Sequence, residues 1–411
     1  MLDPPEVALK VGDARRIAML TADNWKTDPR QFWLRAEAPP EPVRFDEDAG
    51  IWHVSGYREA QCVLADTVTF SSHTGRLVPE AEEFSAGSLT QLDPPRHTKL
   101  RKLVNHAFTP RVVTRLEPKI RAIATELLDA AHPDRFDLVA DFAYPLPITV
   151  IAELLGVPST DRERIHRWVD GMFAGSSDVS MRERTPEQER ELRDAMYHAQ
   201  EMGAYIGDHA ARRRKEPRDD LLTRLVLAEV DGERLTDREV VNFANLLLIA
   251  GHITTTMLLG NTVLCLDANA VERARVEADR SRVPAAIEES LRMLTPFAVL
   301  ARVTSTATEL AGHTIEADQL VMIWLAAANR DPRQFPRPHS FDLDRDPNPH
   351  LAFGRGTHFC LGAPLARLEG RIALNLLLDR YPHLRCDPAD PPVFFRTPRM
   401  TGTTKLPLLL R

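Results

Sequence analysis

The segment LLLIAGHITTTMLLG, residues 246–260, lies within one long apolar stretch and constrains the fold more than any other part of the chain. Thr236 followed by Glu239 is a capping-box pattern that predicts a helix start, and no helix-ending signal follows until about Asp267. A helix of roughly 30 residues is about 45 Å long. We therefore expect one long central helix inside a large, mainly helical unit.

Small and polar residues interrupt this apolar helix at AGHITTT, residues 250–256. Gly and Thr are poor residues for a helix interior, and buried polar groups need partners. Gly251 and Thr254 share one helix face, and the Thr254 hydroxyl can bond the carbonyl of Ala250 and widen the helix. The segment is either a helix–helix contact made of small residues or a gap beside a bound group.

The remaining patterns predict a mainly α protein with a minor β region. Thirty-one prolines punctuate loops, and there is no internal repeat or low-complexity linker. We expect a single domain over residues 1–411, organised around a buried cofactor. Helical periodicity covers 120–131, 189–215, 285–294 and 364–381, whereas short β-like runs occupy 51–56 and 300–304, then 309–310 and 319–324 with turn-prone Gly312 between them.

Bulk properties exclude several classes of protein. A net charge of −7 without a Lys/Arg-rich block argues against nucleic-acid binding. The first 20 residues lack an apolar core and no 18-residue apolar run occurs, so we expect no signal peptide, no membrane span and a cytoplasmic protein. Four scattered cysteines without a CxxC pair argue against structural zinc, covalently attached haem and disulfides.

The stretch FGRGTHFCLG, residues 353–362, places Cys360 where a Gly-rich loop enters a helix. A helix N-terminus favours the thiolate form of a cysteine. We expect Gly354 and Gly356 to allow close approach and to direct amides at the sulfur, and Phe353 to shield it from water. A lone Cys is often a small core residue, but this composition fits an axial haem ligand.

Three motifs together resemble the cytochrome P-450 family of haem-thiolate monooxygenases. FGRGTHFCLG resembles the family's haem-binding loop, AGHITTT its oxygen-activating helix segment, and Glu289-Ser290-Leu291-Arg292 its ExxR helix. They occur in the family's order, and the resemblance covers essentially the whole chain. It implies the cytochrome P-450 fold, with haem b (iron protoporphyrin IX) between the long central helix and the Cys-loop helix.

The resemblance also assigns site residues. It implies Cys360 as the iron ligand and Glu289–Arg292 as a buried structural pair that braces the Cys loop. In many relatives a third cation joins that pair; here Pro338-His339-Ser340-Phe341 places Ser340 at its position, so we expect an altered set with His339 as a substitute. Each cation could instead be a solvated surface residue. The implied haem contacts are His97, Arg101, Arg302, His358, Phe353 and Gly354.

The implied reaction inserts one oxygen atom of O₂ into a C–H bond. Thr254 is then the expected proton relay, while Ala250 and Gly251 leave space for O₂. Most relatives have an acid immediately before this Thr, whereas this chain has Ile253, so protons must come from water, His252 or a substrate hydroxyl. A peroxide-driven peroxygenase and a non-enzymatic haem sensor are the alternatives; the retained Thr254 favours the monooxygenase.

The substrate and partners follow from family position. AGHITTT with its flanks resembles actinobacterial enzymes that tailor macrolides, so we expect a large hydrophobic small molecule. Electrons are expected from a separate ferredoxin and ferredoxin reductase docking on the Cys360 side of a monomer. Expected substrate contacts, any of which could be plain core, come from the 73–92 loop, the helices near 168–205, and Leu246, Ile249, Ala298, Val299 and Thr401.

Overall fold

The predicted central helix is present as α11, Asp237–Ala268, in the computed structural model of the chain. Its start is a capping box: the Glu239 N–H donates to the Thr236 hydroxyl over 3.2 Å, and the Thr236 N–H donates to the Glu239 carboxylate over 2.9 Å. Both the start and the end agree with the sequence prediction. Most of the helix is buried, because other helices surround it.

The structure describes residues 41–77, 87–105, 108–132, 135–174, 181, 185–230, 232–395, 397 and 399–410. The expectation for the N-terminal 40 residues and part of the 73–92 and 168–205 predictions lie outside these residues.

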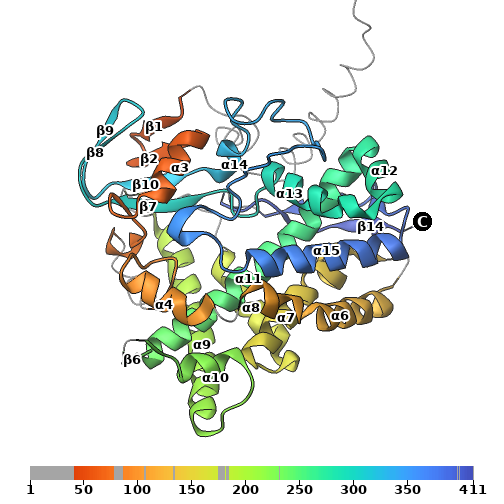
Figure 1. Cartoon of the computed structure of the whole chain (residues 1–411), viewed down its shortest axis with the longest axis horizontal. Coiled ribbons are helices and arrows are strands. Elements are labelled where there is room, and N and C mark those ends of the chain that lie inside the picture. The colour runs from red at the N-terminus through yellow and green to blue at the C-terminus, as the bar shows by residue number, and fades with distance from the viewer. Residues whose placement is uncertain are drawn as a thin grey trace, which may run out of the picture.

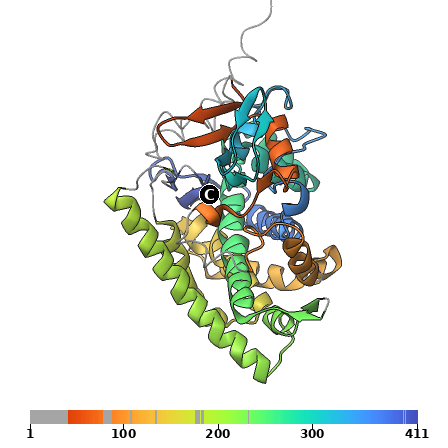
Figure 2. The same cartoon turned by 90° about the vertical axis from the view of Figure 1, so that its left-hand side faces the viewer.

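The helices form the larger part of the molecule, and α11 passes through their middle (Figures 1 and 2). α11 packs directly against α7, α9, α13 and α15, while α9 lies along the outside. The helical regions predicted from periodicity correspond to α6, α9, α13 and α15. The helix bounds are α3 Tyr57–Ala65, α4 Arg96–Asn105, α5 Pro110–Thr114, α6 Glu117–Ala130, α7 Pro145–Leu155, α8 Arg162–Phe173, α9 Pro186–Lys215, α10 Leu221–Val226, α12 Ala270–Ala278, α13 Val283–Met293, α14 Leu325–Ala328 and α15 Ala363–Arg380.

The β region is minor, and its main sheet lies to one side of the helices (Figure 1). Its main sheet has five strands in the order β1 (Val43–Asp46), β2 (Ile51–Val54), β10 (Leu320–Ile323), β7 (Leu300–Thr304) and β3 (Phe70–Ser71). A three-stranded sheet joins β11 (Arg385–Cys386), β14 (Pro407–Leu409) and β4 (Phe136–Asp137). Two-stranded pairs join β12 (Val393–Phe394) with β13 (Thr403–Lys405) and β5 (Glu229–Val230) with β6 (Glu233–Arg234).

The turn at Gly312 differs from the sequence analysis. It connects β8 (Thr308–Leu310) to β9 (His313–Ile315), a strand that was not predicted, and not to 319–324. Ala311 and Gly312 both have positive φ, which suits a tight hairpin and brings the next residues straight back. The region 319–324 forms β10, which pairs with β7 and β2 in the main sheet.

Among the described residues, two helical stretches are long and apolar enough to cross a membrane, residues 138–155 and α11. The sequence analysis judged the apolar runs too short for this. The windows are 67% and 61% buried inside the protein, as expected for core helices. The hydrophobicity of α11 is therefore used for packing.

Candidate active site

One face of α11 is partly exposed although the helix is otherwise a core element. The residues on this face are Leu246, Ile249, Ala250, Gly251 and Thr254, which we call the α11 stripe. Their spacing of three and four residues places them on one side of a helix. Partly exposed residues in an otherwise buried helix border a space inside the protein. The α11 residues that we predicted for the oxygen site and for substrate contact therefore lie together beside that space.

The threonines of AGHITTT bond back to their own helix, as predicted for Thr254. Its hydroxyl donates to the Ala250 carbonyl over 2.6 Å, and Thr255 and Thr256 donate to the carbonyls of Gly251 and His252 over 3.2 Å each. Gly251 lies against α7, since an added Cβ would be 3.4 Å from Ile151. This is an ordinary contact that an alanine would also make, so Gly251 contacts α7 on one side and remains part of the stripe with Ala250 and Thr254.

His252 and Ile253 are both buried, and His252 lies on the opposite side of the helix from Thr254. The His252 ring meets the Tyr144 ring edge-on at 4.0 Å between centroids, and neither ring nitrogen has a hydrogen-bond partner among the described residues. Residues 252 and 254 lie about 200° apart around a helix. This placement argues against His252 as the proton donor to Thr254.

Burial lowers the pKa of His252 to about 3, and this predicts a pH-dependent stability. The unfolded chain binds a proton near pH 6.5 that the folded chain excludes, so the free energy of unfolding should fall by about 1.4 kcal/mol per pH unit below 6.5. Denaturant unfolding at several pH values will measure this slope. His252→Phe should reduce the slope by about 1.4 kcal/mol per pH unit, while the exposed control His383→Gln should leave it unchanged; equal slopes for His252→Phe and the parent would contradict the assignment.

The Cys loop holds Cys360 immediately before α15. The Cys360 N–H donates to the Phe353 carbonyl over 2.8 Å, and Gly354 and Gly356 turn the loop with φ of 69° and 68°. Gly356 also passes close to α3, where an added Cβ would lie 3.1 Å from the Leu64 carbonyl oxygen. The two glycines therefore serve the turn and the close approach, as predicted.

The amides that reach the sulfur differ from the prediction. Burial raises the pKa of the Cys360 thiol, and the backbone N–H groups of Gly362 and Ala363 act in the opposite direction as donors to it. They belong to the start of α15 and not to Gly354 or Gly356. The helix N-terminus thus supplies the hydrogen bonds that stabilise a thiolate.

The four predicted propionate-binding residues come together around the loop, and burial lowers the pKa of both histidines among them. The rings of His97 (α4) and His358 lie 4.2 Å apart, and His358 Nε2 is 3.0 Å from the Ser72 hydroxyl. Arg302 reaches the same cluster from β7, and burial lowers its pKa to about 10. Arg101 of α4 donates to the carbonyls of Thr357 and Phe359 and so ties α4 to the loop.

Two of these buried side chains carry nitrogen atoms without a hydrogen-bond partner among the described residues, although Nη1 of Arg302 donates to the Ala301 carbonyl. His97 and Arg302 are 1% and 5% exposed, yet both ring nitrogens of His97 and Nε of Arg302 have no hydrogen-bond partner among the described residues. Buried cations and donors without partners are costly, so this cluster favours a bound anion. Carboxylates such as the two propionates of haem fit this donor set. The cluster, the Cys360 sulfur and the α11 stripe therefore fit a haem.

The Glu289–Arg292 pair is buried as predicted, with two hydrogen bonds of 2.8 Å. The third cation is Arg345, whose Nε lies 3.1 Å from both Glu289 oxygens. The expected altered set with His339 is therefore corrected: a charged set is present, and its third member comes five residues after Ser340. Asn348 also donates to Glu289, which connects the set to the chain just before the Cys loop.

The remaining predicted substrate residues lie on two segments that pair with each other. The Ala298 N–H donates to the Arg399 carbonyl over 2.9 Å, the Thr401 N–H donates to the Pro296 carbonyl over 2.8 Å, and Phe297 and Met400 form a bridge. We call residues 296–298 with 399–401 the paired segment. Ala298, Val299 and Thr401 are buried, and Leu77 packs in the apolar cluster of Val299.

The fold and the site together define a haem-thiolate protein. The sequence model of the cytochrome P-450 family matches residues 51–411, and the chain belongs to that family. It is a cytochrome P-450 monooxygenase.

Named relatives cover nearly the whole chain. Cyclomarin C epoxidase of Salinispora arenicola is 42% identical over 389 residues, covering 92% of this chain and 95% of the relative. Erythromycin C-12 hydroxylase of Saccharopolyspora erythraea is 42% identical over 380 residues, covering 92% and 93%. The crystal structure of a post-tailoring hydroxylase of himastatin biosynthesis is 50% identical with a TM-score of 0.83, covering 95% of this chain and 99% of that one.

Proposed function

We propose that this enzyme hydroxylates or epoxidises a large apolar natural product, a macrolide or a related polyketide, as one domain with haem b. The α11 stripe carries the proposal: its aliphatic residues border the space that Thr254 faces. The name of one relative, erythromycin C-12 hydroxylase, supports this substrate class, and that of cyclomarin C epoxidase supports oxidation of a natural product. When bound, the haem supplies oxygen activation; Cys360 holds it, and His97, Arg101, Arg302 and His358 bind its propionates.

A substrate titration tests the proposed class. Ferric holoprotein is titrated with 6-deoxyerythronolide B, erythromycin-type macrolides, terpenoids and fatty acids, and the low-to-high spin shift is recorded. We expect a shift with macrolides, because displacement of water from an apolar site accompanies their binding. A shift with terpenoids or fatty acids alone would overturn the macrolide proposal.

Thr254 is the proposed proton-relay residue, with Ala250 and Gly251 leaving room for O₂. Its hydroxyl has a donor bond to Ala250 and keeps acceptor capacity toward the space beside the stripe. Since Ile253 is apolar and His252 faces away, we propose that water or a substrate hydroxyl supplies the proton. Phe353 and Gly354 belong to the loop that shields the sulfur.

Thr254→Ala should lower product formed per NADPH by about 10²-fold, in the range of general acid–base effects. Thr255→Ala is the matched control, because Thr255 makes the same backward hydrogen bond but is buried away from the stripe. Product and NADPH are measured together. A similar loss in both variants would show that helix geometry, and not the Thr254 hydroxyl, is responsible.

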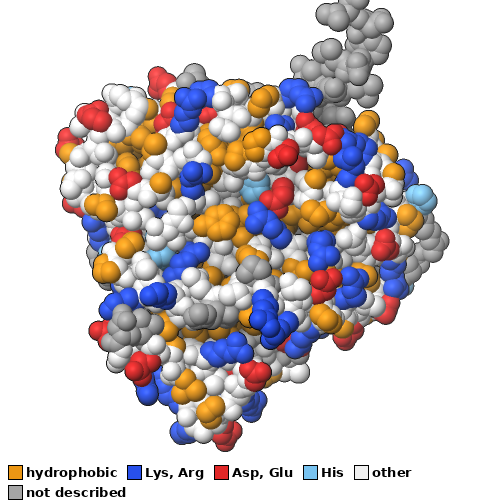
Figure 3. All heavy atoms as spheres, in the orientation of Figure 1, with side chains coloured by type: hydrophobic (Ala, Val, Ile, Leu, Met, Phe, Trp, Pro, Cys, Tyr) orange, Lys and Arg blue, Asp and Glu red, His pale blue; other side chains and the backbone are white. Residues whose placement is uncertain are grey.

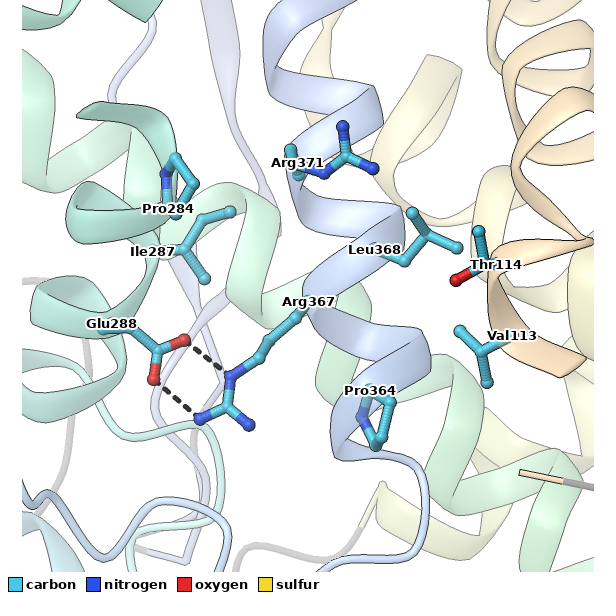
Figure 4. Close-up of a pocket in the computed structure, with 9 residues that line it drawn as sticks. All are labelled: Val113, Thr114, Pro284, Ile287, Glu288, Pro364, Arg367, Leu368 and Arg371. Carbon is cyan, nitrogen blue, oxygen red and sulfur yellow. Dashed lines mark hydrogen bonds and ion pairs between the residues drawn. The ribbon is translucent and has the colours of Figure 1, made fainter. Parts of the chain in front are cut away.

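The electron donor is proposed to be a ferredoxin with its reductase, docking on a face that the sequence did not reveal. Lys and Arg side chains lie over α4 and α15 in Figure 3. Beside them a cavity of about 280 Å³ opens between α5, α13 and α15, and Figure 4 shows Arg367 turned toward Glu288 within it. Phe359, next to Cys360, is 42% exposed. The cations of this proposed docking face are Lys102, Arg111, Arg115, Arg367 and Arg371.

This docking face is also connected to the sulfur. Arg367 donates two hydrogen bonds of 2.7 Å to the Glu288 carboxylate. Its guanidinium lies 4.5 Å from the centre of the Phe353 ring, and the backbone carbonyl of Phe353 accepts a hydrogen bond from the Cys360 N–H. Burial would raise the pKa of Glu288, but hydrogen bonds from Arg367 and His350 lower it to about 2. The pair therefore stays charged at neutral pH and keeps Arg367 over Phe353.

Charge reversal tests the docking face. Lys102→Glu and Arg371→Glu should raise the KM for an acidic ferredoxin by about tenfold at low salt, because like charges oppose association. The difference should disappear near 1 M salt, where the Debye length is about 3 Å. Arg193→Glu on α9 is the control, being an exposed cation away from this face. An equal KM change in the control would contradict the assignment.

We further propose that the enzyme is monomeric and cytoplasmic, and that it binds neither nucleic acid nor a membrane.

A further inference from the structure

A buried amide on α11 joins three separate parts of the chain. Asn261 is 1% exposed, and its Nδ2 donates to the carbonyls of Leu294 and Thr401, each over 2.8 Å. Leu294 is the C-cap residue of α13, and Thr401 belongs to the paired segment. Both acceptors are backbone atoms, so Asn261 positions main chain and not one adaptable side chain.

The two bonds hold both strands of the paired segment. Leu294 lies two residues before Pro296, and Pro296 accepts from the Thr401 N–H, so one amide reaches the start of one strand and the end of the other. The backbone bonds within the pair make the two strands move together. The position of Ala298 and Thr401 relative to α11 therefore depends on Asn261.

A steric contact also fixes the distance between the paired segment and α11. An added Cβ on Gly402 would lie 2.6 Å from Cγ of Met257, which is far inside van der Waals contact. Met257 and Asn261 are four residues apart and so share one face of α11. The turn after Thr401 is thus pressed against α11 at Met257 and bonded to it at Asn261.

This face is the continuation of the α11 stripe. Seven residues separate Thr254 from Asn261, which is nearly two helical turns and about 10 Å along the axis. Leu246, Ala250 and Thr254 are partly exposed, whereas Met257 and Asn261 on the same side are buried. The paired segment therefore closes the end of the space that the stripe borders.

We propose that Asn261 is a positioning residue that sets the size of the substrate space above Thr254. It does so by holding the paired segment at a fixed distance from α11. The inference rests on the proposed function, because it takes the space beside the stripe as the substrate site.

The test uses two probes that need no knowledge of the substrate. Imidazole requires only access to the haem iron, whereas the phenyl group of 4-phenylimidazole must also fit the space next to it. In Asn261→Leu, which keeps the number and branching of side-chain heavy atoms and removes both donors, we expect the Kd ratio of the two probes to change by about tenfold. Amide hydrogen exchange at Ala298 and Thr401 should rise together.

Thr262→Val is the matched control for the leucine variant. Thr262 is also buried and bonds the Ser290 hydroxyl of α13 over 2.7 Å, but neither bond of its hydroxyl reaches the paired segment. Its removal should lower stability and leave the probe ratio unchanged. The same ratio change in Thr262→Val would overturn the proposal, because any loosening of α11 from α13 would then suffice.

A second variant changes the distance between the paired segment and α11 from the side of the turn at Gly402. Gly402→Ala should shift the probe ratio by pushing the turn off Met257, and Met257→Ala in the same chain should restore it. An unchanged ratio in both Asn261→Leu and Gly402→Ala would overturn the proposal while the haem site stays valid. A parent protein that binds neither probe would instead remove the proposed function, and this inference with it.

Discussion

Cys360→Ala is expected to abolish the red-shifted absorption of the ferrous–CO complex together with all monooxygenase activity. The sulfur lies at the start of α15, where the amides of Gly362 and Ala363 donate to it. A thiolate ligand produces the shifted band and favours O–O cleavage, and an alanine methyl supplies no ligand. The loss of activity should therefore be complete.

The control for Cys360→Ala is Cys62→Ala. Cys62 is an exposed free cysteine on α3, so its removal should leave the shifted band intact. Difference spectra of the reduced, CO-treated proteins at equal haem content will decide. A shifted band that survives in Cys360→Ala would rule out this cysteine as the iron ligand.

Arg292→Leu is expected to lower the free energy of unfolding by about 3–5 kcal/mol, because it breaks the buried ion pair with Glu289 and also leaves three backbone carbonyls without their donor. The Arg292 guanidinium is 0% exposed and donates to Glu289 and to the carbonyls of Asn329, Pro338 and Ser340. Arg292→Lys should lose most of the same energy, since an ammonium cannot match this planar fork. Guanidinium unfolding curves will measure both variants.

A substitution of Arg345 should lower the free energy of unfolding by less than Arg292→Leu does. Arg345→Ala should cost about 1.5–3 kcal/mol, the usual range for hydrogen bonds to a charged group, because Glu289 still keeps Arg292. Arg337→Ala is the control, since its ion pair with Asp342 is exposed and should contribute less than about 1 kcal/mol. Equal losses for Arg345→Ala and Arg337→Ala would show that Arg345 is not the third member of the charged set.

The features that the sequence could predict depend on residues that lie close together in the chain. The capping box at Thr236 depends on residues three apart, so the start of α11 could be read directly, and the turn glycines of the Cys loop are likewise local. The cations His97, Arg302 and His358 lie far apart in sequence and were predicted only through family resemblance. The structure confirms that they meet.

The missed features all depend on contacts between distant segments. Arg345 reaches Glu289 across 56 residues, and Asn261 reaches Thr401 across 140. Ser340 occupies the family position of the third cation, whereas the folded chain brings that cation from Arg345, farther along the sequence. The proposed docking face would likewise draw its cations from three helices that are separate in sequence, α4, α5 and α15.

The unpartnered donors of His97 and Arg302 have a consequence for the protein in the cell. A group that binds only the folded chain raises its stability by mass action, and anions at these cations would bind in that way. The fraction of unfolded chains available to proteases should then fall as haem supply rises. Cells short of haem would accumulate less of this enzyme even at constant synthesis, so its abundance would follow cofactor availability.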